Sequence, residues 1–121
     1  MEKTDEQMLK FICEIILNKK GENIKILDVT PLTSVTDTIV IASGNSTRQL
    51  TAISDEIERK VKKSFKTRPL SISGKELSEW ILLDYNSIIV HLFLTKTREY
   101  YNLEELWEKD DNQISIQELN I

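Results

Sequence analysis

The chain has 121 residues, of which 40% are apolar and 30% are charged. This length allows one domain with a hydrophobic core, and the composition is typical of a folded protein rather than a disordered one. The apolar runs are too short to span a bilayer, so no membrane segment is expected. A net charge of −4 repels phosphate backbones, and we therefore expect little direct contact with nucleic acid.

The amino terminus lacks the basic start and the apolar stretch of a secretory signal, so the protein is expected to stay in the cytoplasm. The single cysteine, Cys13, lies among apolar residues and has no second cysteine for an internal disulfide, which predicts a buried, reduced thiol. A zinc site built from histidine and cysteine is excluded by counting, because the chain has one of each. No metal and no cofactor are predicted.

The chain up to residue 73 shows two helical and three strand patterns. Apolar residues recur at helical spacing over residues 8–16. Residues 24–30 and 38–43 are rich in branched side chains and are predicted to be strands that pair with each other. Ser46 is placed to cap a long amphipathic helix over residues 47–65. Residues 70–73 alternate between apolar and polar and are predicted to form a short strand.

The strongest turn signal joins residues 80–84 to residues 87–94 through Tyr85 and Asn86, because asparagine tolerates the left-handed conformation that a two-residue turn requires. This register places Trp80 opposite His91 and sorts the side chains onto two faces. The aliphatic face is predicted to be core and comprises Ile81, Leu83, Ile88, Val90, Leu92 and Leu94. The other face is predicted to be an interaction patch and comprises Trp80, Leu82, Ile89, His91 and Phe93.

Asn102 is placed to cap a short helix that ends near Trp107. The polar residues 110–121 form a tail that is either flexible or an edge strand, so we predict one domain over residues 1–109 followed by this tail. The order of elements predicts an α+β fold, with a mixed β-sheet and helices mainly on one face.

Patterns for catalysis are weak. Residues 43–46 join a strand to a helix, as a phosphate-binding turn does. Nucleotidyl transfer by two metal ions would also need a pair of carboxylates on a strand, and no such pair lies nearby in the sequence. A catalytic triad could be assembled from a serine of this turn, His91 and Asp84. The signal is weak, because a lone histidine in a strand is more often a packed or surface residue than a catalytic base. We expect no enzyme activity, with a residual nucleotidyltransferase as the alternative.

Several stretches of the chain resemble the ribosomal silencing factor family, also called the Iojap-like proteins. The resemblance lies in residues 28–29 with 37–46, 80–85, 90–93 and 98–107. It implies a fold related to nucleotidyltransferases but without their catalytic acids. It also implies binding to large-subunit ribosomal protein fourteen, which blocks joining of the small subunit and represses translation.

The chain departs from this family at a few positions. The family often has glycine where Ser78 stands, the pair Gly-Asp where Asn86 and Ser87 stand, and an aromatic residue at or beside Ile39. The first two departures concern turn geometry.

The resemblance and the patch together predict a surface that binds the large ribosomal subunit, with an apolar centre and a charged rim. Its predicted residues are Trp80, Leu82, Asp84, Ile89, His91, Phe93, Arg98, Tyr100 and Tyr101. The alternative for the same patch is a homodimer that buries it against a second copy.

Overall fold

The computed structural model describes residues 3–121, in which five strands form one sheet. The strands are β1 (Glu22–Asp28), β2 (Thr38–Gly44), β3 (Ser71–Ser73), β4 (Trp80–Asp84) and β5 (Ile88–Leu94). They lie in the order β1-β2-β5-β4-β3, with β2 and β5 parallel and every other neighbouring pair antiparallel. The predicted pairing of the first two strands and the predicted α+β class with a mixed sheet are confirmed.

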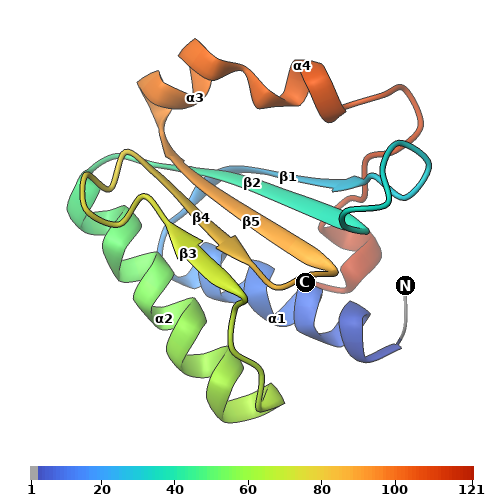
Figure 1. Cartoon of the computed structure of the whole chain (residues 1–121), viewed down its shortest axis with the longest axis horizontal. Helices are drawn as coiled ribbons and strands as arrows, with labels where there is room; N and C mark the ends of the chain where they lie inside the picture. The colour runs from blue at the N-terminus through green and yellow to red at the C-terminus, as the bar shows by residue number, and fades with distance from the viewer. Residues whose placement is uncertain (1–2) are drawn as a thin grey trace.

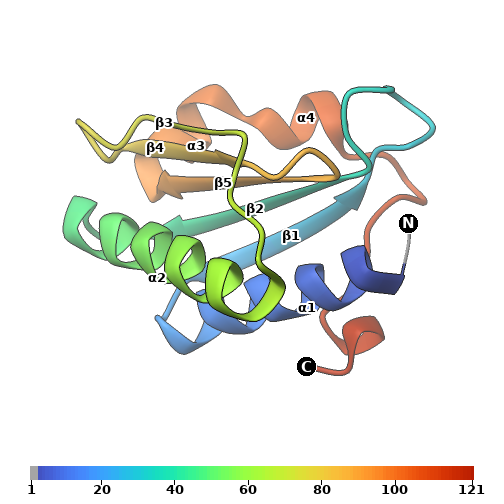
Figure 2. The ribbon, with the colours of Figure 1, turned by 60° about the horizontal axis from the view of Figure 1, so that its bottom comes forward.

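The helices lie on both faces of the sheet (Figures 1 and 2). They are α1 (Lys3–Asn18), α2 (Thr47–Phe65), α3 (Thr95–Tyr101) and α4 (Leu103–Trp107), followed by a 3-10 turn, η1 (Gln117–Leu119). The two long helices cover one face, as predicted, but α3 and α4 lie over the other face, which was expected to be largely open. Over residues 3–121, none of these helices has the length and apolar character needed to cross a membrane.

Two hydrophobic clusters follow from this layering. The larger one fills the space between α1, α2 and the sheet, and it includes the predicted aliphatic face of the β4–β5 hairpin. The smaller one lies on the opposite face, where partly buried side chains of β4 and α4 pack on five buried residues: Leu27, Val29, Ile39, Ile41 and Phe93. Burial of apolar area on both faces explains why the short helices stay in place.

The hairpin turn lies one residue later than predicted. The backbone N–H of Tyr85 donates to the carbonyl of Ile88, so the loop consists of Asn86 and Ser87. Trp80 therefore pairs with Phe93 rather than with His91. This change alters each cross-strand partner by two residues, and because side chains alternate with a period of two, both predicted faces are preserved.

Two positions at which the resemblance led us to expect glycine adopt left-handed backbone conformations. The φ angle is 54° at Ser78 and 73° at Asn86. Asparagine tolerates this region, and the Ser78 hydroxyl is held by the carbonyl of Lys75 and by the Thr51 hydroxyl. The turns thus keep a glycine-like geometry without glycine.

The C-terminal segment runs beside β1. Asn112 accepts a backbone hydrogen bond from Asp28, and Ile114 donates one to Ile26. Apolar side chains of the segment pack against the larger cluster: Ile114, Ile116 and Leu119.

Cys13 is fully buried in α1, which confirms the predicted burial. Burial, with a smaller contribution from Glu14, raises the pKa of its thiol to about 12. The thiol is therefore protonated at neutral pH and is a poor nucleophile.

Candidate functional site

The sheet face that carries α3 and α4 is ordered in rows across the strands. One row joins Trp80 to Phe93, the next joins Ser73 and Leu82 to His91, and the third joins Ser71 and Asp84 to Ile89. Buried residues of the smaller cluster lie toward β1 and β2, whereas the residues toward β3 are partly or fully exposed. We call this last part the open face: Ser71, Ser73, Leu82, Asp84 and Ile89.

An aromatic stack connects the open face to α3. The Trp80 ring lies 4.7 Å from the ring of Phe93 beneath it and 4.9 Å from the ring of Tyr101 on α3, measured between centroids. Tyr100 meets Tyr101 edge to face at 5.0 Å. Phe93 is 0% exposed, Tyr101 is 55% exposed and Tyr100 is 81% exposed. The stack therefore runs from the core to the solvent.

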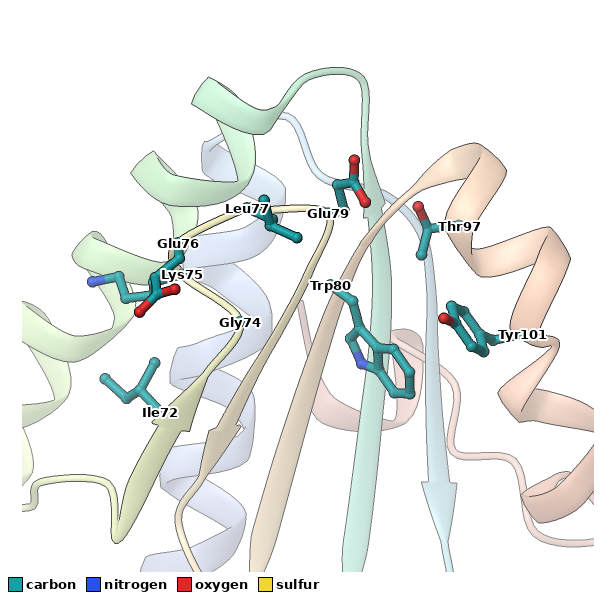
Figure 3. A pocket seen from close by; sticks show the side chains of 9 residues that line it. All are labelled: Ile72, Gly74, Lys75, Glu76, Leu77, Glu79, Trp80, Thr97 and Tyr101. Carbon is teal, nitrogen blue, oxygen red and sulfur yellow. The ribbon is translucent and has the colours of Figure 1, made fainter.

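A groove of about 590 Å³ runs beside this stack. Trp80 from β4 and Tyr101 from α3 point toward each other along one side, and the β3–β4 connection closes the other (Figure 3). Leu77, which is 75% exposed, lines that second side together with Lys75, Glu76 and Glu79. The Lys75 ammonium pairs with Asp55 and Glu58 on α2, so its charge is offset. The groove thus combines exposed apolar area with the negative charge of two glutamates, which suits a basic partner.

His91 is buried and supports the stack from below. The indole N–H of Trp80 donates to Nδ1 of His91 at 3.1 Å. Burial lowers the pKa of His91 to about 4, so the imidazole is neutral at physiological pH and can accept this bond. The histidine orients Trp80 and does not face the solvent.

Arg98 is buried and fixes α3 to the sheet. Its guanidinium donates to the Ser43 hydroxyl at 2.8 Å, to the backbone carbonyl of Asn23 at 2.7 Å and to the Glu104 carboxylate at 3.1 Å. These partners belong to β2, β1 and α4. One side chain therefore positions the helix that presents Tyr100 and Tyr101.

The predicted site residues divide into two groups. Trp80, Leu82, Asp84, Ile89, Tyr100 and Tyr101 have solvent-exposed area on one continuous side of the molecule, and we call these six residues the docking surface. The other three residues, His91, Phe93 and Arg98, are buried, so they are placed to support the docking surface and not to contact a partner directly. The cause is α3 and α4, which bury Phe93, together with the partners that hold His91 and Arg98 inside.

The β3–β4 connection was not predicted as part of this site. Leu77 is an exposed leucine next to Glu76 in a segment without strand or helix periodicity. An apolar residue in such a loop is the signal that could have identified it. Leu106 on α4, which is also exposed, was read only as part of a helix.

The catalytic alternatives do not assemble. Asp84 accepts from the backbone N–H of Asn86, His91 accepts from Trp80, and Ser43 accepts from Arg98, so the three triad members have separate partners. Within residues 3–121, no three His, Cys, Asp or Glu side chains lie close enough to hold a metal ion.

The turn into α2 is closed by its own side chains. The Ser46 hydroxyl accepts from the backbone N–H of Gln49, which confirms the predicted cap, and the Gln49 amide oxygen accepts from the backbone N–H of Asn45. The Gln49 amide nitrogen donates to the carbonyls of Lys19 and Lys20. Two of the N–H groups that would bind a phosphate at this turn are thus already satisfied.

Exposed aromatic residues beside a sheet face, without an assembled catalytic group in the described residues, are typical of a binding protein. Comparisons with known proteins show the family. The family model described as "Ribosomal silencing factor during starvation" matches residues 2–121. The chain belongs to this family, and the resemblance seen in the sequence is confirmed.

Individual relatives support the assignment. The ribosomal silencing factor of Haemophilus influenzae is 36% identical over 101 residues, covering 83% of this chain and 97% of the relative. The mouse protein named "Mitochondrial assembly of ribosomal large subunit protein 1" is 34% identical over 102 residues, covering 82% of this chain but 44% of the relative. The crystal structure of protein CV0518 from Chromobacterium violaceum superposes with a TM-score of 0.82 at 29% identity, over 100% of both chains.

Proposed function

We propose that this ribosomal silencing factor acts in the cytoplasm by binding large-subunit ribosomal protein fourteen through its docking surface. The bound protein would occupy space that the small subunit needs, so that subunits do not join and translation falls. No chemical turnover is required for this mechanism.

The observation that carries the proposal is the exposed aromatic pair on α3. Tyr100 and Tyr101 present large apolar rings to solvent although a second hydrophobic cluster lies directly beneath them. Aromatic residues of this kind are the usual anchors of protein interfaces. Arg98 holds α3 in a fixed position, so the rings are presented with little loss of conformational entropy on binding.

The charge of the surroundings indicates the kind of partner. Glu76 and Glu79 lie in the groove beside Trp80, and Asp84 lies at the far end of the open face. Ribosomal proteins are commonly rich in lysine and arginine, and complementary charge accelerates the encounter between two proteins. An apolar centre with an acidic rim therefore suits a basic protein surface.

We also propose that the fold is related to that of the nucleotidyltransferases but lacks their catalytic acids. The closed turn into α2 argues against a working nucleotide site. Calorimetry with a nucleoside triphosphate and magnesium tests this directly: we expect no heat of binding, and saturable binding would support the residual nucleotidyltransferase instead.

Density-gradient sedimentation of mixed ribosomal subunits tests the function. Excess protein is expected to shift the mixture from joined ribosomes to free subunits and to migrate with the large subunit. An unchanged profile would refute the proposal. Sedimentation velocity of the protein alone tests the homodimer: a dimer that Tyr101→Ala converts to a monomer would mean that the docking surface serves self-association.

A further inference from the structure

The basic residues of this acidic protein are concentrated in one segment. Residues 59–70 contain six Lys or Arg side chains and no acidic residue. The rest of the chain has 10 basic against 20 acidic side chains. The net charge of the chain therefore hides a local region of strongly positive potential.

The structure folds this segment around a hollow. Five cationic side chains line a depression of about 380 Å³ at the C-terminal end of α2: Arg59, Lys62, Lys63, Lys66 and Arg68. Lys66 adopts a left-handed conformation, with φ 55°, that ends the helix and redirects the chain. This turn allows Arg68, which lies beyond the helix, to line the same depression as Lys62.

Most of these charges have no acidic partner. Arg59 pairs with Glu56 one turn earlier on α2. Within residues 3–121, Lys62, Lys63, Lys66 and Arg68 form no ion pair, and the Lys66 ammonium donates only to the carbonyl of Lys63. Several like charges held together without counter-charges repel each other, and an anion would remove that repulsion.

The helix macrodipole explains only part of the cluster. Cations in the last turn of a helix are stabilising, which accounts for Lys62 and Lys63. The effect falls off within that turn and does not reach Arg68. An apolar partner is also disfavoured, because no hydrophobic side chain lines the depression.

We propose that this basic hollow binds backbone phosphates of RNA, and this rests on the proposed function because ribosomal RNA is the polyanion that the protein would meet. Guanidinium and ammonium groups are the usual protein ligands of phosphate. Helix α2 lies on the sheet face opposite α3 and α4 (Figures 1 and 2), so the hollow is separate from the docking surface. The expectation of little nucleic acid contact, drawn from net charge, would then hold for the rest of the chain but not for this segment.

The salt dependence of binding to isolated large subunits tests the proposal. Each phosphate contact adds close to one to the slope of log affinity against log salt, so the double variant Lys62→Gln, Arg68→Gln is expected to lower that slope by roughly 1 to 2 and to weaken binding several-fold at low salt. The control variant Lys19→Gln, Lys20→Gln removes the same charge from the exposed end of α1. It is expected to keep the slope of the wild type.

Equal slopes in the two double variants would overturn the proposal. If the wild type does not bind large subunits at all, the proposed function fails and a short fluorescein-labelled single-stranded RNA decides about the hollow by anisotropy at low salt. Binding that the hollow variant loses and the control retains would support phosphate recognition. Absence of RNA binding, or displacement by polyglutamate but not by unlabelled RNA, would overturn it, the latter in favour of an acidic protein partner.

Discussion

Acidification is expected to destabilise the protein through His91. The buried imidazole has a pKa of about 4, compared with 6.5 for the same group in the unfolded chain. Between these two values the unfolded state takes up a proton that the folded state does not accept. The contribution of His91 to stability is therefore fully present above pH 6.5 and is lost as the pH falls toward about 4.

The size of the effect follows from the difference between the two pKa values. It corresponds to about 3 kcal/mol of unfolding free energy, since one pKa unit is worth about 1.4 kcal/mol. The structural cause is twofold. Burial disfavours the imidazolium, and a protonated Nδ1 can no longer accept the hydrogen bond from the Trp80 indole.

Urea unfolding across this pH range, on wild type and on His91→Gln, is the appropriate assay. Glutamine does not titrate, and its amide oxygen can still accept from Trp80. Carboxylates titrate in both proteins, so the difference between the two curves isolates His91. We expect the stability of the wild type to fall by about 3 kcal/mol more than that of the variant. Parallel curves would refute the burial argument.

Three further predictions concern the docking surface and its support. Trp80→Ala is expected to cost about 3 kcal/mol in urea unfolding, because the ring stacks on Phe93, and a loss below about 1 kcal/mol would show that the stack is not formed. Arg98→Ala is expected to cost about 3 kcal/mol by leaving the buried Ser43 hydroxyl and two partly buried acceptors unpaired, and Arg98→Lys should recover only part of this loss in thermal unfolding. Asp84→Asn should leave the free energy of unfolding unchanged, because an amide oxygen can replace the carboxylate at the turn. Its association with large subunits, measured by stopped flow, should become slower and less dependent on salt. An unchanged association rate would mean that Asp84 is not part of the charged rim.

The face on which each side chain of the β4–β5 hairpin lies could be predicted, because side chains alternate between the two faces along a strand. The turn was placed one residue too early, yet Ile81 and Leu92 still face the larger cluster, as expected. A register error of two residues leaves every side chain on the same face, so the alternation of side chains cannot reveal it. The identity of the core face was therefore more robust than the identity of each cross-strand pair.

Helix α3 could not be predicted from local signals. It begins directly after β5, its N-cap is Leu94 without a side-chain hydrogen bond, and its first turn contains the β-branched residues Thr95 and Thr97. What holds it is Arg98, whose partners Asn23 and Ser43 lie far away in sequence. Such contacts have no local signature, so the burial of Phe93 and Arg98 was missed with the helix.

The cluster of basic residues at the end of α2 is present in the sequence, but the negative net charge of the whole chain hides it. The amphipathic pattern places Lys62 and Lys63 on the solvated face of the helix, and both side chains are exposed. Only the three-dimensional turn at Lys66 shows that Arg68 joins them around one depression.

The affinity of Tyr101→Ala for isolated large ribosomal subunits tests whether the docking surface binds the ribosome. Tyr101 is 55% exposed, so its removal should change the free energy of unfolding by no more than about 1 kcal/mol. Leu70→Ala is the matched control, because Leu70 is 72% exposed but lies before β3 and outside the docking surface. If the docking surface binds the ribosome, Tyr101→Ala should weaken binding by about 2 kcal/mol, roughly 30-fold, while Leu70→Ala should bind like the wild type. Equal affinity of wild type and Tyr101→Ala, with both proteins folded, would contradict it.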